Sequence, residues 1–162
     1  MTYEPVFYET VDQHLSLPTF SFAPDRDGPN GYFSVGGIPP VNTTGKTASA
    51  SILTSKGTHS KPSINQSDYY YINIDGAIVG GTNYSSSFAP FVGFVDNATP
   101  LTMLPSAIVT SIARSFNPPA SIAASTQLRG DHILGATFLN NVLSTFDLGT
   151  SEVRFTGLSQ KL

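Results

Sequence analysis

Short runs of apolar, aromatic and β-branched residues recur along the chain, and polar turn residues separate them. Good examples are Thr19–Ala23, Tyr32–Val35 and Ala50–Thr54. The gap at 24–31 holds proline, aspartate, glycine and asparagine, each of which favours a turn. Runs of this length, bounded by such residues, predict strands. We therefore expect a mainly β protein.

Two stretches have helical spacing instead. In residues 4–15 the apolar side chains recur so that they share one face, and Pro5 suits the first turn of a helix. In Pro105–Arg114 a proline again stands at the start, and Ile108 and Ile112 are spaced to face inward. The pattern predicts two short helices beside the strands.

An acid follows one of the apolar runs. Residues 94–105 read Phe-Val-Asp-Asn-Ala-Thr-Pro-Leu-Thr-Met-Leu-Pro, so that Asp96 enters a tight turn. A second run, Ile133–Val142, is interrupted by Gly135. One segment that ends in an acid and another that carries a glycine are the parts of a carboxylate site.

These motifs, in this order, resemble the C-terminal lobe of the pepsin-like aspartic peptidases. The pattern Val-Asp-x-x-Thr-x-Leu begins at Val95, and Ile-Leu-Gly-x-x-Phe-Leu begins at Ile133. The remaining pieces fit the family from near Pro5 to Phe155. The resemblance implies that residues 1–162 form one lobe of the pepsin-like acid protease fold, with the N-terminal lobe absent. It also implies a secreted or vacuolar location, although the first residues lack the pattern of a signal peptide.

The resemblance places the chemistry on one side chain. Aspartic peptidases use two carboxylates that share a proton and polarise a water molecule, and each lobe supplies one of them. The matching candidate is Asp96. Its turn is completed by Asn97, Ala98 and Thr99, and the supporting loop holds Leu134 and Gly135.

The turn departs from the family's Asp-Thr/Ser-Gly. Asn97 replaces a hydroxyl residue and Ala98 replaces the glycine. An alanine forced to positive φ would cost about 1 kcal/mol, so we expect strain at Ala98. In addition, residues 117–132 are too few for the strands that form one wall of the family's substrate cleft.

Two functions follow from these features. The first is a degenerate lobe that hydrolyses little or no peptide by itself and acts as a binding or structural domain. The second is an aspartic endopeptidase that is active as a homodimer, or together with a separate N-terminal lobe. Both readings imply a protein or peptide partner.

Composition excludes other classes. With 8 basic and 11 acidic residues the chain offers no electrostatic footprint for nucleic acid or an anionic membrane. It has no cysteine, and we expect no cofactor and no metal. Asp25 and Asp27 lack the other oxygen ligands of a calcium loop, and the neighbours Asp131 and His132 would point to opposite faces of a strand. Asn-x-Ser/Thr patterns begin at Asn42, Asn65, Asn83 and Asn97, and chance can account for several in a chain this rich in these residues.

Overall fold

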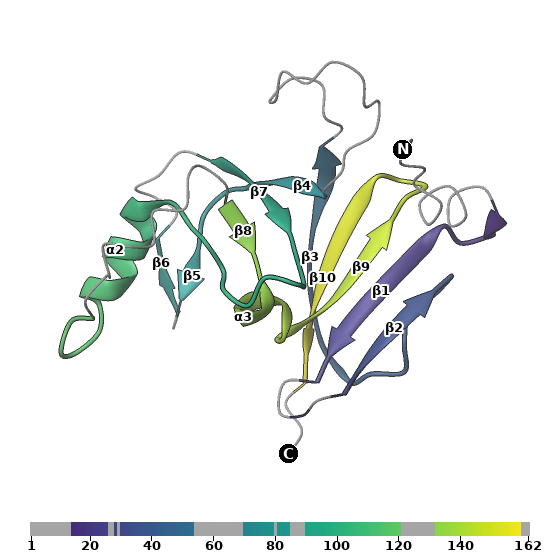
Figure 1. Ribbon diagram of the computed structural model, residues 1–162, viewed down its shortest axis with the longest axis horizontal. Coiled ribbons are helices and arrows are strands. Elements are labelled where there is room, and N and C mark those ends of the chain that lie inside the picture. The colour runs from purple at the N-terminus through teal and green to yellow at the C-terminus, as the bar shows by residue number, and fades with distance from the viewer. Residues whose placement is uncertain are drawn as a thin grey trace, which may run out of the picture. The chain divides into compact units, whose positions relative to one another are not determined.

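The computed structural model describes residues 14–25, 28, 30–53, 70–79, 81–84, 90–120 and 132–159 (Figure 1). The chain divides into two compact units. Unit 1 comprises Met1–Leu53 and Ala136–Leu162, and unit 2 comprises Thr54–Gly135. The expected helix over residues 4–15 lies almost wholly outside the described residues.

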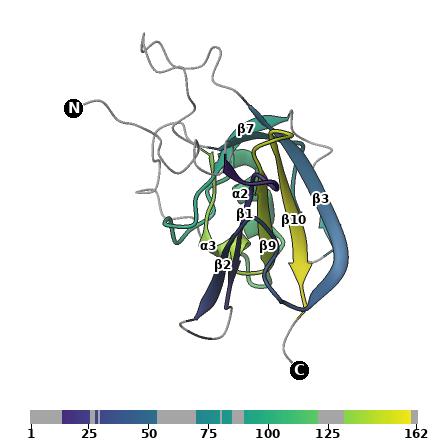
Figure 2. The ribbon, with the colours of Figure 1, turned by 90° about the vertical axis from the view of Figure 1, so that its right-hand side faces the viewer.

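Unit 1 is an antiparallel sheet in which neighbouring strands follow the order β2-β1-β9-β10-β3. β10 and β3 lie side by side in both Figure 1 and Figure 2. The strands are β1 (Thr19–Pro24), β2 (Gly31–Val35), β3 (Thr43–Leu53), β9 (Val142–Asp147) and β10 (Glu152–Leu158).

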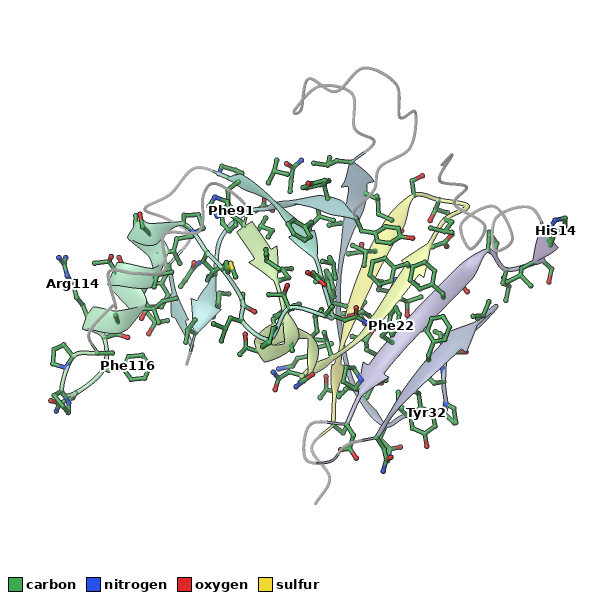
Figure 3. All side chains as sticks on the ribbon, in the orientation of Figure 1. His14, Phe22, Tyr32, Phe91, Arg114 and Phe116 are labelled. Carbon is green, nitrogen blue, oxygen red and sulfur yellow. The ribbon has the colours of Figure 1, made fainter. Side chains whose placement is uncertain are left out.

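Side chains alternate across this sheet and give it one apolar and one polar face. Phe20 and Phe146 are paired across β1 and β9, and their rings stack with centroids 4.6 Å apart. Val153, on the same face, is fully buried. The helix α3 (Ala136–Leu139) contributes Phe138, whose ring lies nearly perpendicular to that of Phe155, with the ring centroids 5.3 Å apart. The apolar face therefore forms the core of this unit, and Phe22 of β1, labelled in Figure 3, lies on this face beside Phe146.

Unit 2 contains a three-stranded sheet and a hairpin. β7 (Phe91–Val95) pairs with β4 (Tyr71–Ile74) in antiparallel fashion and with β8 (His132–Leu134) in parallel fashion. The hairpin joins β5 (Ile78–Val79) to β6 (Thr82–Asn83).

The helix α2 (Ser106–Arg114) completes unit 2 and inserts a fully buried Ile108. At its far end Arg114 and Phe116 are exposed (Figure 3). None of the helices in the described residues is long and apolar enough to cross a membrane.

The expected fold class is confirmed: the protein is mainly β, consistent with one pepsin-like lobe, and the described residues include two short helices, α2 and α3. β1, β2 and α2 match the predicted stretches within a residue. β3 is longer than predicted, because its polar first half pairs with β10. The short helix α3 was not predicted, since it lies inside an apolar run that favours a strand.

Candidate active site

The backbone of Asp96 is held from both sides at the end of β7. The N–H of Val95 donates to the carbonyl of Tyr70 at 3.1 Å, on the β4 side. The N–H of Asp96 donates to the carbonyl of Leu134, also at 3.1 Å, on the β8 side. Consecutive N–H groups of a strand point in opposite directions, so these two bonds fix where the chain leaves the sheet. Leu134, a residue of the predicted supporting loop, therefore anchors the acid directly.

Donors of the same turn orient the carboxylate of Asp96. Its Oδ1 accepts the backbone N–H of Ala98 at 2.9 Å, and its Oδ2 accepts the hydroxyl of Thr99 at 2.6 Å. Bonds to an ionised acceptor are shorter and stronger than neutral ones, and side chains of Asp commonly close turns in this way. Two carboxylate oxygens offer about four acceptor positions, so the group can still accept from a water molecule or a substrate.

The expected backbone strain at Ala98 is absent. Among the described residues, Ser151 is the only non-glycine residue with positive φ, so Ala98 has a negative φ. The turn delivers its N–H to Asp96 without the left-handed conformation for which glycine would be needed. The substitution of the family's glycine therefore leaves the local hydrogen bond intact. Asn97 and Ala98 are both exposed.

Gly135 packs against the carbonyl groups of the turn. A Cβ at this position would lie 2.3 Å from the oxygen of Leu101 and 2.6 Å from the oxygen of Thr99. Both distances are far inside van der Waals contact, so only glycine fits while the turn keeps its place. Thr102 adds a long hydrogen bond of 3.4 Å from its hydroxyl to the Gly135 carbonyl.

Sequence reasoning did not assign a role to Met103. Its N–H donates to the carbonyl of Ile133 at 2.8 Å, and the N–H of Ile133 donates back at 2.9 Å. This antiparallel bridge places the segment after the turn on the free side of β8, while β7 pairs with the other side. The segment thus flanks β8 and locks the Ile-Leu-Gly motif against the turn. Only the short alternation Leu-Thr-Met at residues 101–103 could have indicated a strand there.

Asp96 has no second acid beside it within the described part of unit 2. The other acid described there is Asp75, which follows β4. Because Ile74 pairs with Phe91, Asp75 lies at the opposite end of β7 from Asp96. At roughly 3.3 Å per residue the two positions are about 20 Å apart along the strand. The described residues of this unit thus supply one carboxylate to the site.

The other candidates that the structure describes do not gather into a site. Asp27 and Asp131 lie outside the described residues, and the ring of His132 packs edge-on against Phe91 at 5.0 Å. In the ranges that the structure describes, no three metal-ligating side chains gather. Asn42, Asn83 and Asn97 are exposed, whereas Asn65 lies outside the described residues.

Comparison with known proteins decides the family. The model of the eukaryotic aspartyl protease family matches residues 1–128, most of the chain. The chain belongs to the eukaryotic aspartyl protease family. A relative from Aspergillus fumigatus, a probable aspartic-type endopeptidase, is 26% identical over 210 residues, which cover 94% of this chain and 47% of the relative.

The chain spans about half the length of this aspartyl protease relative. The aligned stretch of 210 residues is also longer than the chain of 162 residues, so the relative carries additional residues inside it. The predicted shortening of the cleft wall at 117–132 stays a prediction, because residues 121–131 lie outside the described ranges.

Proposed function

We propose that this chain is an aspartic-peptidase lobe that contributes a single carboxylate, Asp96, and that hydrolyses little or no peptide by itself. The observation that carries the proposal is the geometry of the turn. Asp96 is anchored and oriented like a functional group, yet it has no partner acid in the described part of its unit.

Peptide hydrolysis by this family requires two carboxylates a few ångströms apart. Two like charges that close cannot both ionise, so the pair holds one proton, and it polarises the water that attacks the peptide carbonyl. A lone carboxylate can accept a hydrogen bond from water, but it cannot also donate one to the carbonyl oxygen while it is ionised. Asp96 alone can therefore bind the attacking water but cannot also donate a hydrogen bond to the peptide carbonyl.

Without hydrolysis, the lobe would serve as a binding or structural domain for a protein or peptide. An extended peptide that passes the exposed residues Asn97 and Ala98 would meet the carboxylate of Asp96 and the exposed Leu101. Such a surface combines a hydrogen-bond acceptor with an apolar contact, which suits a peptide backbone flanked by an apolar side chain.

The alternative is an active endopeptidase in which a second copy of the chain, or a separate N-terminal lobe, supplies the second acid. The unstrained turn favours this alternative, because Ala98 leaves the hydrogen bond to Asp96 in place. In a homodimer the two copies of Asp96 would meet on a two-fold axis.

Complementation separates these possibilities. The chain is mixed with the separately produced N-terminal lobe of an aspartic peptidase, and hydrolysis of an unfolded protein is followed from about pH 3 to 6, the acid range over which carboxyl groups titrate. Activity that appears only in the mixture, and is lost with Asp96→Asn, would show that Asp96 is a competent half of a dyad. Activity of the chain alone that rises with the square of its concentration would support the homodimer and contradict our proposal.

A further inference from the structure

A groove of about 410 Å³ lies on the polar face of the unit 1 sheet. Its floor carries Thr145 and Asp147 of β9 together with Glu152 and Arg154 of β10, and Leu17 and Ile38 give it an apolar wall. Both wall residues are more than half exposed, at 59% and 62%. None of these six residues takes part in the Asp96 turn.

The strand register places the four floor side chains together. Asp147 lies opposite Glu152, and Thr145 lies opposite Arg154, so all four project from the same face. Like charges directly opposite each other destabilise a sheet unless a cation balances them. Arg154 approaches Glu152 only to 3.8 Å, with both side chains partly exposed. The acid pair is therefore only weakly compensated, and Asp147 has one oxygen with no hydrogen bond in the described residues.

The buried hydroxyl of Thr145 faces this floor as an acceptor. It is only 6% exposed and lies 3.2 Å from the hydroxyl of Ser21, which in turn lies 3.1 Å from the carbonyl of Gly37. Ser21 is the donor in both contacts, so the hydroxyl oxygen of Thr145 accepts from Ser21. A hydroxyl oxygen has two lone pairs. The remaining lone pair of Thr145 can accept from a donor in the groove.

The groove thus offers acceptors for a cation, a guanidinium for an anion, and an apolar wall. Asp147 and Arg154 are diagonal neighbours across two strands, a relation that places their Cα atoms about 7–8 Å apart. Two extended residues span about 7 Å, so the two ends of a dipeptide match this spacing.

We infer that the groove binds short apolar peptides with free termini. Asp147 and Thr145 accept hydrogen bonds from the terminal ammonium group, Arg154 binds the terminal carboxylate, and Leu17 and Ile38 contact an apolar side chain. Peptides with free ends are what an endopeptidase releases, but no residue of the Asp96 turn lines this groove.

The test is an NMR chemical-shift titration of the full chain with the dipeptide Leu-Leu. Two blocked probes, N-acetyl-Leu-Leu and Leu-Leu amide, each lack one terminal charge. We expect saturable binding of Leu-Leu with a Kd of about 1 mM or tighter, and at least about tenfold weaker binding of each blocked probe. The same titration with Asp96→Asn should give the same Kd, which separates this inference from the peptidase proposal.

Two variants assign the charges to residues. Arg154→Met should weaken the binding of Leu-Leu until its Kd equals that of Leu-Leu amide. Asp147→Asn should make the Kd of Leu-Leu equal to that of N-acetyl-Leu-Leu. Lys46→Met, which removes an exposed cation of β3, is the matched control and should change neither. Absence of saturable binding, or equal binding of the free and blocked dipeptides, would overturn the inference.

Discussion

The unit 1 sheet and the surroundings of Asp96 in unit 2 are held in place by different means. In unit 1 large side chains pack together in the core: Phe20 stacks on Phe146, and Val153 is fully buried. Around Asp96 in unit 2 the chain itself packs closely, since Gly135 touches the carbonyls of Thr99 and Leu101 and hydrogen bonds fix the acid. Side-chain packing tolerates gradual change, whereas backbone contact does not. We therefore expect stability to depend chiefly on the first region and the geometry of the site on the second.

The largest loss of stability is expected from Phe146→Ala. Phe146 is 4% exposed and contacts the rings of Phe20 and Phe22, so its removal leaves a cavity in the unit 1 core. Truncation of a buried Phe costs about 3–5 kcal/mol, measured as the free energy of unfolding in urea. The matched control is Phe33→Ala, since Phe33 is 54% exposed on the same face. Equal losses in the two variants would contradict the assignment of the core.

The next largest loss of stability is expected from Gly135→Ala, which should also change the geometry of the turn around Asp96. The added methyl group would overlap two backbone oxygens, which overpacks a rigid contact and costs about 1–3 kcal/mol or more. It should also displace the NMR signals of Ala98 and Thr99. Gly37→Ala is the control, because a Cβ there meets nothing within 4 Å. A Gly135→Ala variant with unchanged stability and unchanged turn signals would refute the close contact.

Thr99→Val tests the hydrogen bond that orients the carboxylate. Valine keeps the shape but removes the hydroxyl that donates to Asp96 at 2.6 Å. Loss of a hydrogen bond to a charged group costs about 1.5–3 kcal/mol, and partial exposure puts this one near the lower end. The same substitution at Thr47 removes only an exposed contact to Thr156 and should cost less than about 0.5 kcal/mol. If both substitutions have the same effect, the hydroxyl of Thr99 does not orient Asp96.

The smallest effect is expected from Ala98→Gly, and its sign is informative. Because Ala98 has a negative φ, glycine relieves no strain and only gives the unfolded chain more freedom, which costs about 0.4–1 kcal/mol. Gly81→Ala provides the opposite case, since φ is +82° and an alanine there is strained. If Ala98→Gly instead raises the stability, Ala98 is strained in the native turn, as the sequence had suggested.

The sequence predicted most where side chains decide the structure. The alternation around Phe20 and the helical spacing around Ile108 identified β1 and α2 almost to the residue. It predicted least where partners distant in the chain decide. The polar half of β3 is a strand only because β10 pairs with it, and Met103 reaches Ile133 thirty residues later. The φ angle of Ala98 could not be inferred from the residue type. The family has glycine at this position, and that comparison predicted backbone strain that the structure does not show.

The central claim is that this lobe contributes a single oriented carboxylate, Asp96, which is insufficient for peptide hydrolysis by itself. It is tested most directly by hydrolysis of an unfolded protein from about pH 3 to 6, the range of carboxyl titration, with the chain and its Asp96→Asn variant compared after both are shown to be folded. We predict that the chain and the Asp96→Asn variant show the same absence of hydrolysis at every protein concentration. Acid-dependent cleavage by the chain alone, abolished in Asp96→Asn, would contradict the account and show that copies of this lobe complete the pair for one another.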